Sequence, residues 1–88
     1  IKIDTEGNEL AVLQGAVRIL QEIKPKVIFE SRGGGDRIKL FNLLHSCNYG
    51  ICYLPWKPMN NIQSIGLNQF LDSSLTNYIA VPESSLKI

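Results

Sequence analysis

The chain begins Ile1-Lys2-Ile3-Asp4-Thr5-Glu6-Gly7-Asn8-Glu9-Leu10, and these ten residues are the most informative about its architecture. A short apolar run with β-branched residues stops at an acid, passes a glycine and continues into a helical pattern. This order is typical of a buried strand that delivers carboxylates to its own carboxyl end before the chain crosses over. In open α/β sheets, ligands bind in the crevice at those strand ends. We therefore predict a strand at residues 1–3, with Asp4 and Glu6 at the mouth of a site.

The composition limits the class of protein. A chain of 88 residues, 44% hydrophobic and 19% charged, has the size and balance of one globular domain at most. Its formal net charge of +1 and its lack of a basic run argue against nucleic-acid binding. No apolar stretch approaches the roughly 20 residues of a membrane helix, and no signal peptide is recognisable. Cys47 and Cys52 make no dense disulfide framework, so we expect a reducing, cytoplasmic location.

The first strand leads into a helical segment. Leu10, Leu13, Val17 and Leu20 recur at steps of three and four, which predicts an apolar stripe that faces a sheet. Glycine inside a helix costs about 1 kcal/mol relative to alanine. Gly15 therefore predicts a break, with one helix ending at residue 14 and another at 16–23. The alternative is one continuous helix that is kinked at Gly15.

A second strand follows Pro25. The run Lys26-Val27-Ile28-Phe29-Glu30 has an unbroken apolar centre, the pattern of a strand that is covered on both faces. Strand, helix and strand with this crossover length predict a parallel pair with a right-handed connection. Glu30 should therefore end its strand at the same edge of the sheet as Asp4.

The rest of the chain predicts a helix from Asp36 to about Cys47, a third strand at 51–54 and a last strand at 77–81. Residues 55–76 lack a regular pattern except for a short helix near 67–71, and a loop of this length is usually functional or partly disordered. Residues 83–88 read as a loose tail. The helix at 36–47 should bury Ile38, Phe41 and Leu44, with Leu40 as a further candidate.

Several linked patterns resemble one enzyme family. They are Lys2-Ile3-Asp4-Thr5-Glu6-Gly7-Asn8-Glu9, Leu13-Gln14-Gly15-Ala16, Pro25, Phe29-Glu30 and the closing Asn77-Tyr78-Ile79-Ala80-Val81-Pro82. In this order they resemble FkbM-type methyltransferases, which use S-adenosylmethionine and mostly methylate hydroxyl groups of sugars, glycolipids and natural products. The match is close over residues 1–31 and weaker afterwards.

The resemblance implies a partial doubly wound, Rossmann-like methyltransferase sheet. Residues 1–88 would form a single partial domain, the C-terminal half of that fold, with strands four to seven. The last strand would run antiparallel between the fifth and the sixth. The glycine-rich turn and the acid that hold most of the S-adenosylmethionine would lie upstream of Ile1. Gly33-Gly34-Gly35 does not replace them, because it follows the wrong strand and lacks the G-x-G-x-x-G spacing.

The resemblance also suggests roles for individual residues. Asp4 and Glu6 are the catalytic candidates, because a carboxylate at this position can orient or deprotonate an acceptor hydroxyl. Glu30, Trp56 and Asn77 are the candidates for binding a small-molecule or carbohydrate acceptor. The plainer interpretation is that Glu6 only interacts with the helix dipole, that Glu30 is a solvated strand end and that Trp56 anchors a loop.

Other residues have plainer interpretations. His45, Cys47 and Cys52 match no standard zinc spacing, so no metal site is predicted, and both cysteines fit buried apolar positions. Arg32 is either a surface residue or a partner for a cofactor carboxylate or a substrate phosphate.

Two functions remain open at this point. In the first, the chain is part of an S-adenosylmethionine-dependent O-methyltransferase and is inactive on its own. In the second, it is a non-catalytic α/β module that pairs with a partner through an exposed strand edge. Residues 1–3 would form such an edge and give a homodimer. A phosphoacceptor receiver domain built around Asp4 does not fit, because the further acids and the lysine that it needs are not at the required strand ends.

Overall fold

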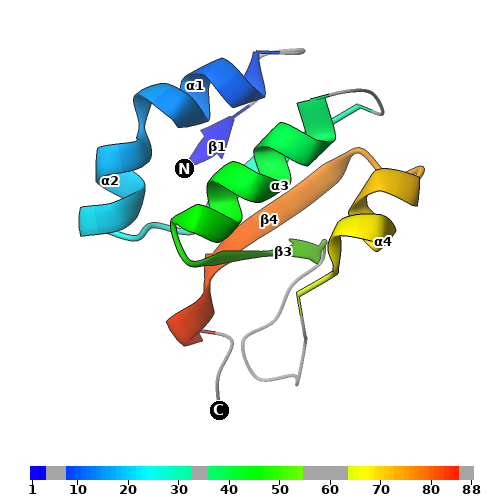
Figure 1. Cartoon of the computed structure of the whole chain (residues 1–88). Coiled ribbons are helices and arrows are strands. Elements are labelled where there is room, and N and C mark those ends of the chain that lie inside the picture. The colour runs from blue at the N-terminus through cyan, green and yellow to red at the C-terminus, as the bar shows by residue number, and fades with distance from the viewer. Residues whose placement is uncertain (4–7, 33–35, 55–63, 86–88) are drawn as a thin grey trace.

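A mixed sheet is the centre of the molecule. The computed structural model describes residues 1–3, 8–32, 36–54 and 64–85. Within them the sheet contains β1 (Lys2–Ile3), β2 (Val27–Glu30), β3 (Tyr49–Tyr53) and β4 (Asn77–Pro82). The strand order is β1-β2-β4-β3. Figure 1 shows β4 beside β3. The predicted α/β class is thus confirmed, and this mixed sheet is compatible with a partial Rossmann-like fold.

The strand directions also agree with the sequence pattern. β1 and β2 are parallel neighbours, with Lys2 opposite Ile28 and Ile3 opposite Phe29. β4 lies between β2 and β3 and is antiparallel to both. The prediction of an antiparallel last strand, inserted between the two strands that precede it in the chain, is therefore confirmed.

The crossover between β1 and β2 contains two short helices, α1 (Glu9–Gly15) and α2 (Val17–Glu22). The predicted break is confirmed, because Ala16 leaves the helical conformation and its backbone N–H donates a hydrogen bond to the Leu13 carbonyl at 3.0 Å. Leu13 and Leu20 are buried as the apolar stripe predicts. Asn8 occupies the N-cap of α1, but its side chain makes no capping hydrogen bond.

Helix α3 (Asp36–Ser46) differs from the prediction in the face that it buries. Ile38 was expected in the core, but 47% of it is exposed, and Arg37 is buried instead. Residues 37, 40 and 44 are three and four positions apart and share one face, whereas residue 38 lies about 100° further around the helix. Leu40 and Leu44 are buried as expected.

Strand β3 begins two residues earlier than predicted. Asn48 has a φ of 64°, the left-handed conformation that ends many helices, and its backbone N–H donates to the His45 carbonyl at 3.0 Å. Because Asn48 alone reverses the chain, Tyr49 and Gly50 are free to join the sheet, where they pair with Pro82 and Val81.

The long irregular region contains the short helix that was predicted, α4 (Leu67–Asp72). The backbone N–H of Gly66 donates to Gln69 Oε1 at 2.8 Å and stabilises the start of α4. Phe70 of α4 is buried and packs edge-to-face on Tyr78, with ring centroids 5.0 Å apart. A 3-10 turn (Glu83–Ser85) follows β4. These three residues therefore have regular structure, although residues 83–88 were predicted to be a loose tail.

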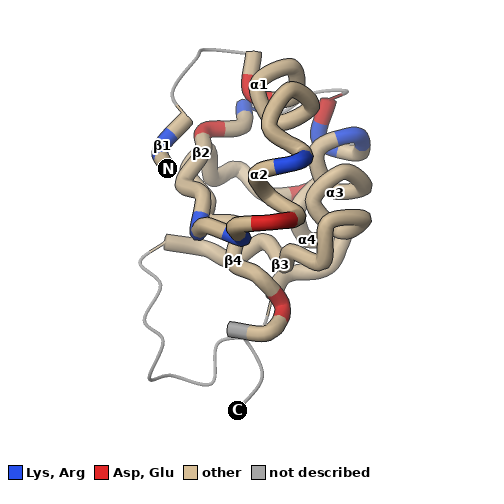
Figure 2. The backbone as a smooth tube through the Cα atoms, turned by 90° about the vertical axis from the view of Figure 1, so that its left-hand side faces the viewer, with Lys and Arg blue, Asp and Glu red and all other residues tan. Residues whose placement is uncertain are grey.

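The two faces of the sheet are covered differently. α1, α2 and α3 lie on one side of β1 and β2 (Figure 2), where Val27 and Phe29 join the main core. Ile28 points to the opposite face because side chains alternate along a strand. There it packs with Leu54 against a small cluster of buried residues, Cys52, Ile79 and Val81. No described helix has the length and apolarity needed to cross a bilayer.

Candidate functional site

The carboxyl ends of β1 and β2 lie side by side at one rim of the sheet. This follows from their parallel pairing, in which Ile3 is opposite Phe29, so that Glu30 is the next residue at this rim. β4 starts at the same rim, because Asn77 is opposite Glu30. The end of β3 is there too, because Tyr53 is opposite Tyr78. In an open α/β sheet this rim is where a ligand site is expected.

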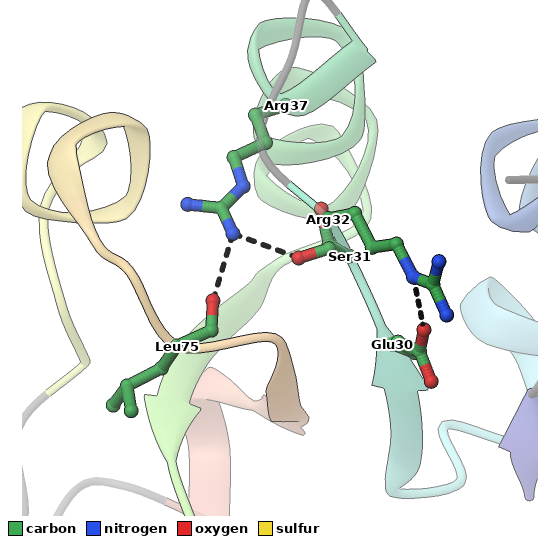
Figure 3. Close-up of polar contacts among 5 residues, drawn as sticks. All are labelled: Glu30, Ser31, Arg32, Arg37 and Leu75. Atoms are coloured by element: carbon green, nitrogen blue, oxygen red, sulfur yellow. Dashed lines mark hydrogen bonds and ion pairs between the residues drawn. The ribbon is translucent and has the colours of Figure 1, made fainter. Parts of the chain in front are cut away.

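Two of the predicted acceptor-binding residues are neighbours at this rim. Glu30 and Asn77 are directly opposite each other in the β2–β4 pair, so their side chains lie on the same face of the sheet. The Glu30 carboxylate accepts a hydrogen bond from Arg32 Nε at 2.8 Å (Figure 3). Because 72% of the Arg32 side chain is exposed, this ion pair contributes at most about 1 kcal/mol to stability.

A groove of about 700 Å³ lies at the rim, next to Asn77. Its described lining comes from β1, β2, the residue after β3, and the segment that leads from the end of α4 into the first residue of β4, so it extends across the sheet. Aliphatic, hydroxyl and amide groups dominate this lining, and the lysine is the only charged residue described in it. The lining residues are Lys2, Ile28, Leu54, Ser74, Leu75, Thr76 and Asn77.

Arg37 fixes the wall of this groove from inside the protein. Its guanidinium donates hydrogen bonds to four backbone carbonyls, those of Phe70 (2.5 Å), Ser73 (2.8 Å), Ser31 (2.7 Å) and Leu75 (2.8 Å). Figure 3 shows the guanidinium of Arg37 between Ser31, which follows β2, and Leu75, which precedes β4. One arginine thereby ties the end of β2 to the end of α4 and to the start of β4.

Aromatic rings complete the environment of Arg37. Its guanidinium carbon lies 5.0 Å from the ring centroid of Phe70 and 5.4 Å from that of Tyr78, which are cation–π distances. The side chain is only 1% exposed, and its Nε is the one buried polar side-chain atom without a hydrogen-bond partner in the described part of the chain. Carbonyl dipoles and aromatic faces, rather than a carboxylate, are thus the described stabilisers of this buried charge.

Sequence analysis missed Arg37 and the polar wall of the groove. The only available signal for Arg37 was its position three residues before Leu40 and seven before Leu44, on the face of α3 that points to the core. Ser74 and Thr76 gave no signal, because hydroxyl residues before a strand are common in loops.

Three predicted site residues are not placed by the structure. Asp4, Glu6 and Trp56 fall outside the described residues. Their proposed roles therefore remain predictions, which are supported only by the positions of the strands that precede these residues in the chain.

The remaining nucleophile and metal-ligand candidates have structural roles. Cys47 and Cys52 are buried free thiols, as predicted, and burial raises the pKa of the Cys52 thiol and keeps it protonated. His45 stacks on Phe41, with ring centroids 6.1 Å apart. Among the described residues, no group of three or more His, Cys, Asp or Glu side chains is placed to bind a metal ion.

Comparison with known proteins gives one result. The family model of the methyltransferase FkbM domain matches residues 1–51, which is more than half of the chain. This match covers β1, the two crossover helices, β2, α3 and the start of β3. No curated protein and no solved structure matches the chain. The chain therefore belongs to the FkbM methyltransferase domain family.

Proposed function

We propose that the chain is the C-terminal half of an S-adenosylmethionine-dependent O-methyltransferase, and that it supplies the acceptor side of the active site. The acceptor would be a hydroxyl group of a sugar, a glycolipid or a natural product. The observation that carries this proposal is the shared rim: β1 and β2 are parallel neighbours, and a groove that crosses the face of both strands reaches this rim at Leu54 and Asn77. The strand order β1-β2-β4-β3 supports it as well, because it equals the order four, five, seven, six that the family resemblance implies.

The described residues do not themselves fit S-adenosylmethionine. That cofactor carries two cationic groups, a sulfonium and an ammonium, which favour acidic partners, and one carboxylate, whereas Lys2 is the only charged residue in the described lining of the groove. We therefore place the main cofactor contacts upstream of Ile1, and assign only acceptor binding to the groove.

Each predicted site residue has a distinct task in this proposal. Asp4 orients the acceptor hydroxyl or accepts its proton, and Glu6 assists it. Asn77 and Glu30 hold further hydroxyl groups of the acceptor, and Trp56 stacks on its ring. Arg32 keeps the Glu30 carboxylate in place through the 2.8 Å hydrogen bond.

The coding region upstream of Ile1 provides the first test. A strand that ends in an acid, followed by a glycine-rich turn, is expected there if the proposal is correct. A start codon immediately before Ile1 would contradict it.

Asp4→Ala, made in the protein that includes the upstream half, provides the second test. The variant should lose most of its turnover and keep its thermal stability, because a carboxylate at a strand end contributes more to chemistry than to folding. Asp72→Ala is the matched control, since Asp72 is an exposed acid at the end of α4. Equal turnover of Asp4→Ala and Asp72→Ala would remove Asp4 from the mechanism.

Binding of S-adenosylmethionine by the 88-residue chain alone provides a third test. We expect millimolar or weaker binding by titration calorimetry, because the described groove offers no acidic partner for the cofactor. Micromolar binding would contradict our placement of the cofactor contacts upstream.

One observation favours the alternative, a non-catalytic module that pairs through a strand edge. In the described sheet β1 has a neighbour on one side only, and 59% of Ile1 is exposed. A start codon directly before Ile1 together with a stable dimer would favour this alternative over the enzyme.

A further inference from the structure

The groove at the rim has an aliphatic floor that is open to solvent. Ile28, Leu54 and Leu75 line it, and 52% of Leu75 is exposed. Figure 3 shows the Leu75 side chain pointing away from Arg37, while its carbonyl points toward the guanidinium. An alkyl segment that covers these three side chains removes apolar surface from water, whereas a fully hydroxylated ring gains little on such a floor.

One end of the groove carries a positive charge. Lys2 is opposite Ile28 in the parallel pair, so both side chains lie on the face of the groove. The described lining contains no carboxylate, and the nearby carboxylate of Glu30 is already bound by Arg32 at 2.8 Å. An anionic group beside Lys2 is therefore favoured electrostatically over a cationic one.

Hydrogen bonds within the protein hold the polar wall of the groove in place. Arg37 donates to the carbonyls of Ser73 and Leu75, and the backbone N–H of Ser31 donates to the Thr76 carbonyl at 2.7 Å. The hydroxyl and amide side chains of Ser74, Thr76 and Asn77 stand on this wall. Because the backbone of the wall is already ordered, a ligand loses less free energy in ordering it on binding.

We propose that the groove binds an anionic amphiphile: its acidic group lies at Lys2, its aliphatic part covers Ile28, Leu54 and Leu75, and its hydroxyl groups contact the polar wall. In so far as this amphiphile is the methyl acceptor, the inference rests on the function proposed above. It narrows the acceptor to molecules that combine an acidic group with an alkyl or acyl segment.

Three probes with the same decyl tail and different head groups test this proposal: decyl sulfate, decyl maltoside and decyltrimethylammonium. Each is titrated below its micelle concentration, and the amide NMR signals of residues 28, 54 and 74–77 are followed. Unchanged far-ultraviolet circular dichroism shows that the fold persists. Decyl sulfate should bind at least about tenfold more tightly than decyltrimethylammonium, the ratio that one close charge contact supplies.

Two substitutions and two matched controls separate the charge from the apolar floor. Lys2→Gln should abolish the preference for decyl sulfate, and Leu75→Ser should weaken all three probes. Lys39→Gln and Ile38→Ser are the controls, because both residues are exposed on α3, which packs on the other face of the sheet. Neither control should change any of the affinities.

Equal affinities for the three head groups would overturn the charge assignment. NMR shifts that occur outside the groove, or equal losses in the variants and their controls, would overturn the site itself. Failure of the enzyme proposal would give a different result from failure of the amphiphile proposal. The groove would bind decyl sulfate, but the protein with its upstream half would methylate no hydroxyl group. The opposite result is also informative. If the protein methylates neutral sugars, and these sugars do not shift the NMR signals of residues 28, 54 and 75, the enzyme proposal stands and the proposal of an anionic amphiphile is wrong.

Discussion

Arg37 is a charged residue that the fold has placed in its core, where its interactions decide the shape of the rim. A guanidinium has five N–H donors in a planar fork, which suits several carbonyls at once. The four carbonyls that it contacts come from the end of β2, from α4 and from the connection to β4. Since charge-assisted hydrogen bonds are the stronger ones, this contact set should contribute substantially to stability.

Replacement of Arg37 tests that contribution. Arg37→Met keeps an apolar stem but leaves four carbonyls without their donor, so we expect a loss of roughly 3 kcal/mol in the free energy of unfolding. Arg37→Lys should not restore it, because one ammonium group cannot reach four carbonyls. Urea denaturation measures both effects.

Arg18→Met is the control for Arg37→Met. The Arg18 side chain is 87% exposed and pairs with Glu22 one helical turn away, so its loss should cost no more than about 0.5 kcal/mol. Equal stability losses at positions 18 and 37 would contradict the role given to Arg37.

Tyr49 makes stability depend on pH in the alkaline range. Burial, and to a lesser extent the charge of Cys47, raises the pKa of Tyr49 from 10.0 to about 12 in the folded state. The unfolded state therefore loses this proton first, so the contribution of Tyr49 is complete below pH 10 and is lost as the pH rises toward 12. The loss should be at most about 1.4 kcal/mol per pH unit.

Thermal unfolding between pH 9 and pH 12 measures this dependence. Tyr49→Phe should flatten it and should also cost about 1 kcal/mol at neutral pH, because the Tyr49 hydroxyl donates to the Pro25 carbonyl at 2.5 Å. An unchanged profile in Tyr49→Phe would show that another group titrates.

At the scale of the elements, the crossover between β1 and β2 has a weak point at Gly15. It is the last residue of α1, and a Cβ built there meets no atom within 4 Å. Gly15→Ala should therefore raise the free energy of unfolding by about 0.5–1 kcal/mol, because alanine loses less backbone entropy on folding. A decrease in stability would mean that the break between α1 and α2 needs glycine itself.

At the scale of the whole molecule, the edge of the sheet at β1 is the surface most suited to self-association. Ile28 N–H donates to the Ile1 carbonyl at 2.8 Å, which ties β1 to β2 on one side, and the other side has no strand in the described sheet. An apolar strand edge of this kind is a template for another chain. We predict that the 88-residue chain forms dimers or larger assemblies.

Light scattering at increasing protein concentration checks this prediction. Ile1→Lys should weaken the association, because a charge at the edge disfavours pairing with a second strand. Ile23→Lys is the matched control, since Ile23 is 72% exposed after α2 and away from the edge. A monomer at all concentrations would contradict the prediction.

The elements and their order along the chain could be predicted from the sequence. The apolar runs at Ile3 and Ile28, the stripe through Leu13 and Leu20 and the break at Gly15 are local patterns, set by backbone and side-chain preferences that act within one turn or one strand. The strand order followed from the family resemblance. Local signals could also indicate that Glu30 ends a strand at the rim.

The surroundings of that rim depend on contacts between residues that are distant in the sequence. The role of Arg37 depends on carbonyls that are up to 38 residues away in the chain, and the groove is formed by side chains from four segments of the fold. Neither feature has a local sequence signature. A hydrogen bond from the Arg37 side chain to a backbone carbonyl places no constraint on the type of residue that carries the carbonyl, and the groove depends on segments that are distant in the sequence. A charged residue in the core, and an aliphatic groove with Lys2 in its described lining, therefore became visible only when the strands were brought together.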